Sequence, residues 1–175
     1  MTVKTTYKFA AIAALLVSAT PAAAAINATA SAEARGLVLQ PLTLTKVSDL
    51  DFGTIIASAT AGTVSIDADT GARSSSGGIT EVPTAPGGRA EFAGAGTTGQ
   101  VVLLTLAAPT LLVSTSNAAD TLAVTSLVLD AGGSTNRTIG VTQAFSVGVG
   151  GNFAIAASQA NGLYTAQFDL TASYQ

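Results

Sequence analysis

The side chains of this chain that could carry out chemistry are carboxylates, because the sequence contains no histidine and no cysteine. Their absence excludes Ser-His-Asp and Cys-His nucleophilic systems and nearly all zinc sites. Asp49 and Asp51 lie two residues apart, as do Asp67 and Asp69, and on a strand each pair would share a face. Two carboxylates can serve a glycosidase, but neither pair has a recognisable catalytic context. We therefore predict that the protein is not an enzyme.

The second aspartate pair also raises the question of a metal ion. The stretch from Asp67 to Gly71 reads Asp-Ala-Asp-Thr-Gly, which resembles the opening of a calcium loop. Calcium takes about six to eight oxygen ligands, whereas alanine, arginine and serine follow at 72–74. An acidic strand face that ends in a turn is the simpler interpretation, and calcium binding at Asp67 and Asp69 stays open as the alternative. We predict no metal site and no cofactor.

The first 25 residues have the order of a secretory signal peptide. Lys4 and Lys8 precede an uncharged apolar run at 9–17, and Ala23 and Ala25 provide an A-x-A cleavage site. The run is too short for a stable membrane span, which needs roughly 20 residues. We therefore predict cleavage after Ala25 and an exported chain, in the periplasm, at the cell surface or outside the cell.

The remaining chain, residues 26–175, is acidic. Once the two lysines of the signal peptide are removed, five basic residues face ten acidic ones, a net charge of −5. Such a chain is a poor partner for nucleic acid. Its length suits one domain. We predict an N-terminal extension at 26–36 and a single folded domain at 37–175.

Apolar residues recur mostly at every second position, and turn residues interrupt the chain at short intervals. This pattern predicts an all-β sandwich of about ten short antiparallel strands. The most apolar strands are expected at 100–106, 111–115 and 121–129, whereas 73–78 is expected to be a polar loop. The glycine-rich stretch at 148–151 is not followed by a helical pattern, so it predicts a turn between strands and not a phosphate-binding loop.

The alternation of apolar and polar residues is strictest at the two ends of the predicted mature chain. Near the C-terminus Gly162 is followed by apolar residues at every second position, which predicts one continuous strand with an apolar face. The residues that carry this signature are Gly162, Tyr164, Phe168, Leu170 and Tyr174. In the extension the alternating apolar residues are Ile26, Ala28, Ala30, Ala32 and Ala34.

Pro-Leu-Thr-Leu-Thr at 41–45, followed by Leu-Asp-Phe-Gly-Thr at 50–54, resembles the opening of the DUF4402 family. The late Gly150-Gly151 and the terminal Gly162-Leu-Tyr164 also match that family. Together with the alternating extension, the glycine fourteenth from the end and the penultimate tyrosine resemble subunits of bacterial fimbriae of the chaperone–usher kind.

The fimbrial resemblance implies an immunoglobulin-like, pilin-like sandwich that lacks one strand. The extension of the next subunit would fill the groove by strand addition and so build a fibre. The terminal strand would form one wall of that groove. The resemblance also implies a periplasmic chaperone and an outer-membrane usher as partners.

Two other interpretations remain open. Residues 26–34 could pair within their own domain and complete the sandwich, which would make the protein a monomer. Such a monomer could be a binding module for a glycan or a protein. A carbohydrate site favours exposed aromatic side chains, whereas most aromatic residues here occupy expected strand positions, where they would belong to the core.

Overall fold

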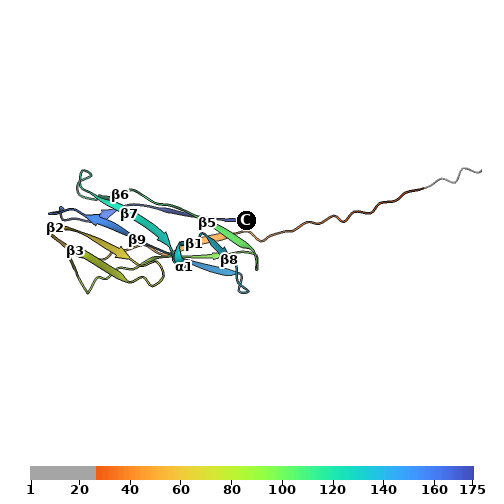
Figure 1. Cartoon of the computed structure of the whole chain (residues 1–175), viewed down its shortest axis with the longest axis horizontal. Coiled ribbons are helices and arrows are strands. Elements are labelled where there is room, and N and C mark those ends of the chain that lie inside the picture. The colour runs from red at the N-terminus through yellow and green to blue at the C-terminus, as the bar shows by residue number, and fades with distance from the viewer. Residues whose placement is uncertain (1–26) are drawn as a thin grey trace, which may run out of the picture. The chain divides into compact units, whose positions relative to one another are not determined.

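The computed structural model describes residues 27–175; the predicted signal peptide and Ile26 lie outside the described residues. Residues Leu37–Gln175 form one compact, nearly all-β unit, which confirms the predicted fold class (Figure 1). Its elements are β1 (Thr43–Ser48), β2 (Ile55–Ile66), β3 (Arg73–Glu81), β4 (Ala90–Ala95), β5 (Val101–Ala107), β6 (Leu111–Ser114), β7 (Thr121–Leu129), α1 (Asp130–Gly133), β8 (Asn136–Thr138), β9 (Ala144–Ile155), β10 (Tyr164–Thr165) and β11 (Asp169–Tyr174).

All strand pairs are antiparallel and form two sheets. The larger sheet has the order β1-β4-β9-β7-β6-β10, with the β2–β3 hairpin attached to β9. The long strand β9 organises it: one edge pairs with β4 along its first half and with β2 along its second half, and the other edge pairs with β7. The smaller sheet has the order β11-β5-β8. The three most apolar predicted strands correspond to β5, β6 and β7.

The core consists of two clusters at the two ends of the domain. In the first, buried side chains of β4, β5, β7 and β9 pack between the sheets, with Val102, Val149 and Leu104 at most 1% exposed. In the second, Val64 and Phe153 are covered by Phe52, whose ring stands edge-on to Phe153 at 4.6 Å. Along β5, for example, Val102 and Leu104 are buried whereas Leu103 and Thr105 are exposed, as the two-residue alternation predicts.

The glycine-rich stretch at 148–151 lies inside β9, so the prediction of a turn there is wrong. Glycine is needed because the backbone of the segment after β2 packs directly on this strand. A Cβ atom at Gly150 would lie 2.3 Å from the carbonyl oxygen of Ile66, and one at Gly148 would lie 2.6 Å from that of Ala68. Close approach of a neighbouring backbone, and not a change of direction, explains these glycines.

The predicted polar loop at 73–78 is instead the first part of β3, which pairs with β2. The serines at 74–76 are exposed, but the side chain of Arg73 is only 4% exposed. Its guanidinium lies 3.3 Å from Glu81 and donates hydrogen bonds of 2.9–3.2 Å to four carbonyl oxygens. These belong to Phe52, Thr54, Val82 and Ala85. The buried arginine therefore holds together two connecting segments that have no strand of their own.

The segment α1 is a tight turn. Ala131 and Gly132 have φ values of 53° and 67°, which are left-handed and not helical. Arg137 fixes the turn by donating to the carbonyl oxygen of Asp130 at 3.1 Å and by pairing with its carboxylate. Among the described residues, no helix is long and apolar enough to cross a membrane.

Candidate assembly surface

The acidic stretch at 67–71 forms a turn between β2 and β3 that its own hydrogen bonds close. The Oδ1 atom of Asp67 accepts from the N–H groups of Asp69 and Thr70 at 3.0 and 2.7 Å, and from the Thr70 hydroxyl at 2.8 Å. Asp69 accepts from the N–H group of Ala131 at 2.6 Å. Within residues 27–175, no three potential metal ligands of the acidic, histidine or cysteine type come together. The geometry accounts for the acids as parts of a turn.

Asp49 and Asp51 are also engaged locally. Asp49 forms an exposed ion pair with Lys46 at 2.5 Å, and Asp51 accepts from the N–H group of Gly53 at 2.8 Å. This second bond supports the turn after the short bridge between Asp51 and Gly88. Each carboxylate therefore has a structural partner of its own.

Asp67 is expected to give the domain a stability that depends on acid pH. The N–H and hydroxyl groups of Thr70 hold the pKa of Asp67 below its ordinary value. The unfolded state then binds the proton more readily, so this stabilisation is present above about pH 4 and is lost as the pH falls through the lowered folded-state pKa. Urea titrations at several pH values below about 4 should therefore show a smaller fall in the free energy of unfolding for Asp67→Asn than for the unaltered chain. An unchanged slope would contradict the assignment.

Gly162 and Tyr164 lie where the terminal segment joins the larger sheet. Gly162 has a φ of 156°, which glycine tolerates best, and the next strand, β10, pairs with β6. The hydroxyl of Tyr164 donates to the carbonyl oxygen of Ala160 at 2.7 Å and accepts from Gln159 at 2.9 Å. The ring packs against the second core cluster.

The prediction of one continuous terminal strand is wrong, because the segment is divided between the two sheets. After β10 the chain has no strand at 166–168 and then forms β11, which pairs with β5 in the smaller sheet. The alternation of faces nevertheless holds around β11: Phe168, Leu170 and Tyr174 are half-buried against the first core cluster. The terminal segment therefore fastens the two sheets together.

Tyr174 is expected to contribute to stability through its hydroxyl group. Its oxygen accepts from the N–H group of Thr97 at 2.8 Å, and the hydroxyl donates to the carbonyl oxygen of Gln40 at 2.9 Å. Tyr174→Phe keeps the packing of the ring and removes both bonds. We expect the free energy of unfolding, measured by urea titration, to fall by about 1–2 kcal/mol. If the free energy of unfolding does not change, water takes over both hydrogen bonds of the hydroxyl in the variant.

Several strands leave an edge without a partner strand within Leu37–Gln175. β1, β3 and β11 each pair on one side only. The strand β1 carries a bulge between Lys46 and Ser48 in its pairing with β4 and follows Pro41, and β11 starts with Asp169. Bulges, prolines and charged residues are features that protect edges from unwanted pairing.

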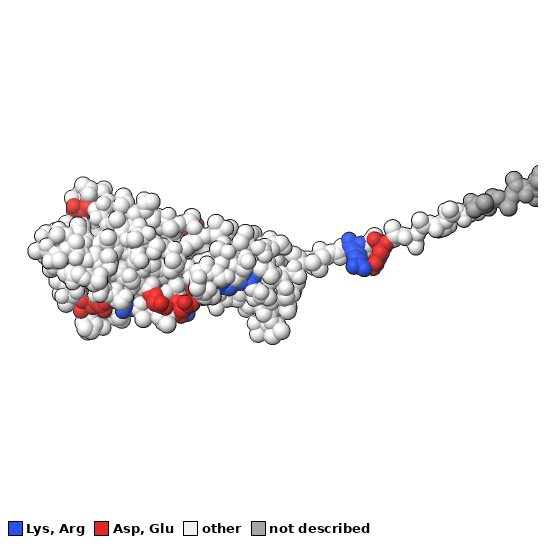
Figure 2. Space-filling model, in the orientation of Figure 1, with Lys and Arg blue, Asp and Glu red and all other residues white. Residues whose placement is uncertain are grey.

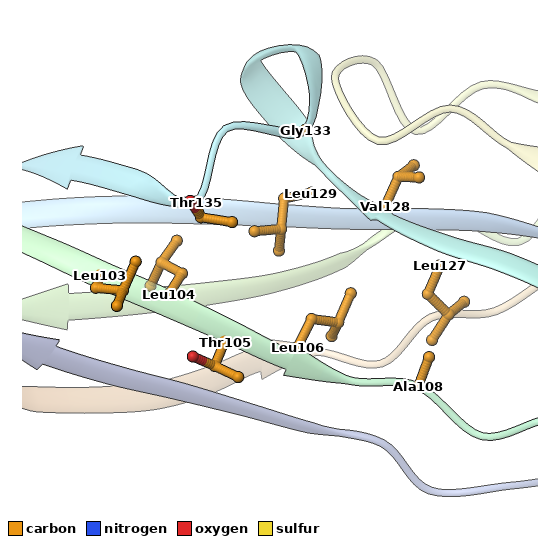
Figure 3. Close-up of a pocket in the computed structure, with 10 residues that line it drawn as sticks. All are labelled: Leu103, Leu104, Thr105, Leu106, Ala108, Leu127, Val128, Leu129, Gly133 and Thr135. Carbon is orange, nitrogen blue, oxygen red and sulfur yellow. The ribbon is translucent and has the colours of Figure 1, made fainter.

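Two further unpaired edges face each other across an apolar hollow, which we call the β5–β7 groove (Figure 3). It has a volume of about 510 Å³. In Figure 3, Leu104 and Leu106 of β5 and Leu127 and Leu129 of β7 project into the space between the two strands. Its lining consists of Leu103, Leu104, Thr105, Leu106, Ala108, Leu127, Val128, Leu129, Gly133 and Thr135. Neither an acidic nor a basic side chain is among them.

The backbone along the groove is only partly hydrogen-bonded. On this side, β5 pairs with β8 as far as Leu103, and the N–H group of Leu104 donates to Thr135 at 2.7 Å. β7 pairs with β6 as far as Ala123, and Val124 donates to Thr110 at 2.9 Å. Residues 105–107 of β5 and 125–129 of β7 have no partner strand here in the described part of the chain. The groove thus combines apolar side chains with free strand edges.

The part of the predicted extension that the structure describes has no helix or strand. All side chains at 27–36 are exposed, including Ala28, Ala30, Ala32 and Ala34. Glu33 and Arg35 form an ion pair at 2.7 Å, with both side chains mostly exposed. Ion pairs of this kind contribute at most about 1 kcal/mol. Nothing within the segment itself gives it a regular structure.

The surface of the domain offers few charged or aromatic groups. Figure 2 shows a largely uncharged face on which acidic and basic side chains occupy a few small areas. Each aromatic side chain in the described residues is at least half-buried. A stacking platform for sugars needs an exposed ring.

The structure thus places Tyr164 in the larger sheet and Leu170 and Tyr174 in the smaller one, and it leaves the described residues of the extension exposed. Reasoning from the sequence missed the groove, because its walls come from β5 and β7, which are separated by β6 along the chain. Residues 42–174 match the family described as a domain of unknown function, DUF4402. No curated protein and no solved structure matches the chain.

Proposed function

The chain belongs to the DUF4402 family, and we propose that it is a structural subunit of a bacterial cell-surface, fimbria-like fibre that assembles by strand addition. In this proposal the N-terminal extension of one copy pairs with a free strand edge of the next. A periplasmic chaperone and an outer-membrane usher would handle the subunit before assembly. The signal-peptide pattern of residues 1–25 supports export, and the proposed role requires no catalysis.

One observation carries this proposal: an apolar groove lies between two unpaired strand edges of the domain. Unpaired edges are templates for pairing with another chain. An added strand gains main-chain hydrogen bonds along the edge, and its alternate side chains enter the groove. The extension supplies a segment of that kind, since it is exposed and alternates small apolar with polar residues. A contact between two different surfaces of the same chain continues head to tail and builds a fibre.

The backbone would supply most of the affinity. Each alanine methyl group that leaves water contributes about 0.8 kcal/mol, and each net hydrogen bond about 0.5–1.5 kcal/mol. Association costs at least about 4 kcal/mol in lost freedom of motion. We therefore expect assembly that strengthens with protein concentration.

The proposal is tested by expressing the chain with its signal peptide and recovering the exported protein. We expect a distribution of masses in light scattering that grows with concentration, and filaments in electron micrographs. A monomer at all concentrations would reject the fibre. That outcome would favour the alternative, a monomeric binding module for a glycan or protein.

A further inference from the structure

We propose that the β5–β7 groove is the acceptor site and that it selects residues 27–32 of a second copy because they are uncharged. This inference rests on the proposed function and specifies its contact. The resemblance to fimbrial subunits implies a different acceptor, one with the terminal strand as a wall. The two arrangements place the added strand on opposite sides of β5, since β11 occupies one edge of β5 and the groove the other.

The length of the groove matches a short segment. The unpaired part of β7, residues 125–129, spans about 17 Å at the rise of a strand. This is roughly half the length of the nine residues at 26–34. Residues 27–32 form the part of the described extension that precedes its first charged residue, Glu33. A strand of five or six residues would therefore fill the open stretch.

The apolar lining of the groove suits an alanine face. Leu104 and Leu129 line it from the two strands and are nearly buried, with only 1% and 6% of their surface exposed. Leu106 and Leu127 face the same space and are half-buried (Figure 3). The methyl groups of an alanine face can lie on these apolar side chains.

The uncharged lining of the groove also favours residues 27–32. None of the residues that line the groove is charged, and residues 27–32 carry no charge either. A buried charge without a partner would be costly. Glu33 and Arg35, which pair with each other, would remain outside the groove.

Disulfide trapping distinguishes the two edges of β5. The chain has no cysteine, so single substitutions introduce the only thiols. Thr105 of β5 and Thr171 of β11 are direct cross-strand partners, and both are exposed. Neighbouring strands lie about 4.8 Å apart, and a disulfide requires Cα atoms within about 7 Å. A strand in the groove can therefore reach Thr105 but not Thr171.

The experiment mixes full-length exported Thr29→Cys protein with either Thr105→Cys or Thr171→Cys protein under mild oxidation. A non-reducing gel should show a cross-linked dimer with Thr105→Cys and at most a trace with Thr171→Cys. Adding Ala30→Asp to the Thr29→Cys chain should lower the yield roughly tenfold, because it would place an unpaired charge in the apolar groove. The matched control is Ser31→Asp, whose side chain points away from the groove and should change the yield little.

Cross-linking to Thr171→Cys alone would overturn the groove as the acceptor and leave the fibre intact. The same holds if neither pair cross-links while light scattering still detects assemblies. If neither pair cross-links and the unmodified protein is a monomer, both the groove and the fibre are rejected. An equal yield from Ala30→Asp and Ser31→Asp would overturn the selection for uncharged side chains.

Discussion

A chain that lacks residues 26–34 is expected to fold normally and to lose its self-association. The described residues of this segment are exposed and lie outside the compact unit Leu37–Gln175, so their removal takes no side chain from either core cluster. It does remove the strand that the proposed contact adds. Light scattering should then report a monomer at concentrations where the full chain assembles, with an unchanged midpoint of urea unfolding.

The matched control keeps the alanines and changes only the charges. Glu33→Gln with Arg35→Gln removes an exposed ion pair, which contributes little to stability. This double variant should assemble as the unaltered chain does. A synthetic peptide with the sequence of residues 26–34 should bind the shortened chain and raise its unfolding midpoint. If the shortened chain is unfolded and no peptide restores it, the segment belongs to its own domain, and strand addition between copies is wrong.

Leu104→Ala is expected to lower the free energy of unfolding by about 2–5 kcal/mol. Leu104 is 1% exposed and lies in the first core cluster between the two sheets, where its loss would leave a cavity. Urea titration of the chain without residues 26–34 measures this effect without a contribution from assembly. Because Leu104 also forms a wall of the groove, the variant should bind the peptide more weakly as well.

The neighbouring residue provides the control. Leu103 is 37% exposed and points away from the core, since successive side chains of β5 alternate between faces. Leu103→Ala should cost less than about 1 kcal/mol, as is usual for partly exposed positions. Equal losses for the two leucines would mean that the faces of β5 are assigned wrongly.

Local patterns in the sequence predicted the class of fold well. The alternation around Leu170 and Tyr174 identifies a half-buried strand, and the structure buries those side chains as expected. The terminal segment, however, gave no sign that it divides between two sheets. Alternation reports which face of a strand is apolar and contains no information about the strand beside it.

Arg73 and Gly150 show the same limit of prediction from local sequence patterns. A run of arginine and serines is typical of a solvated loop, yet Arg73 is buried because carbonyl groups from distant segments surround it. Gly150 resembled a turn residue, yet it lies within β9 because the backbone after β2 packs on it. In both cases the reason for the residue type lies on another part of the chain.

The sequence by itself therefore determined that this is an all-β member of the DUF4402 family, with a net negative charge and no histidine or cysteine. These properties follow from composition, local periodicity and family motifs. Only the tertiary structure decided which strands are neighbours, which edges stay unpaired and where an apolar groove opens. Strand pairing joins residues far apart in the chain, so the free edges of β5 and β7 become visible only once every other strand has its partner.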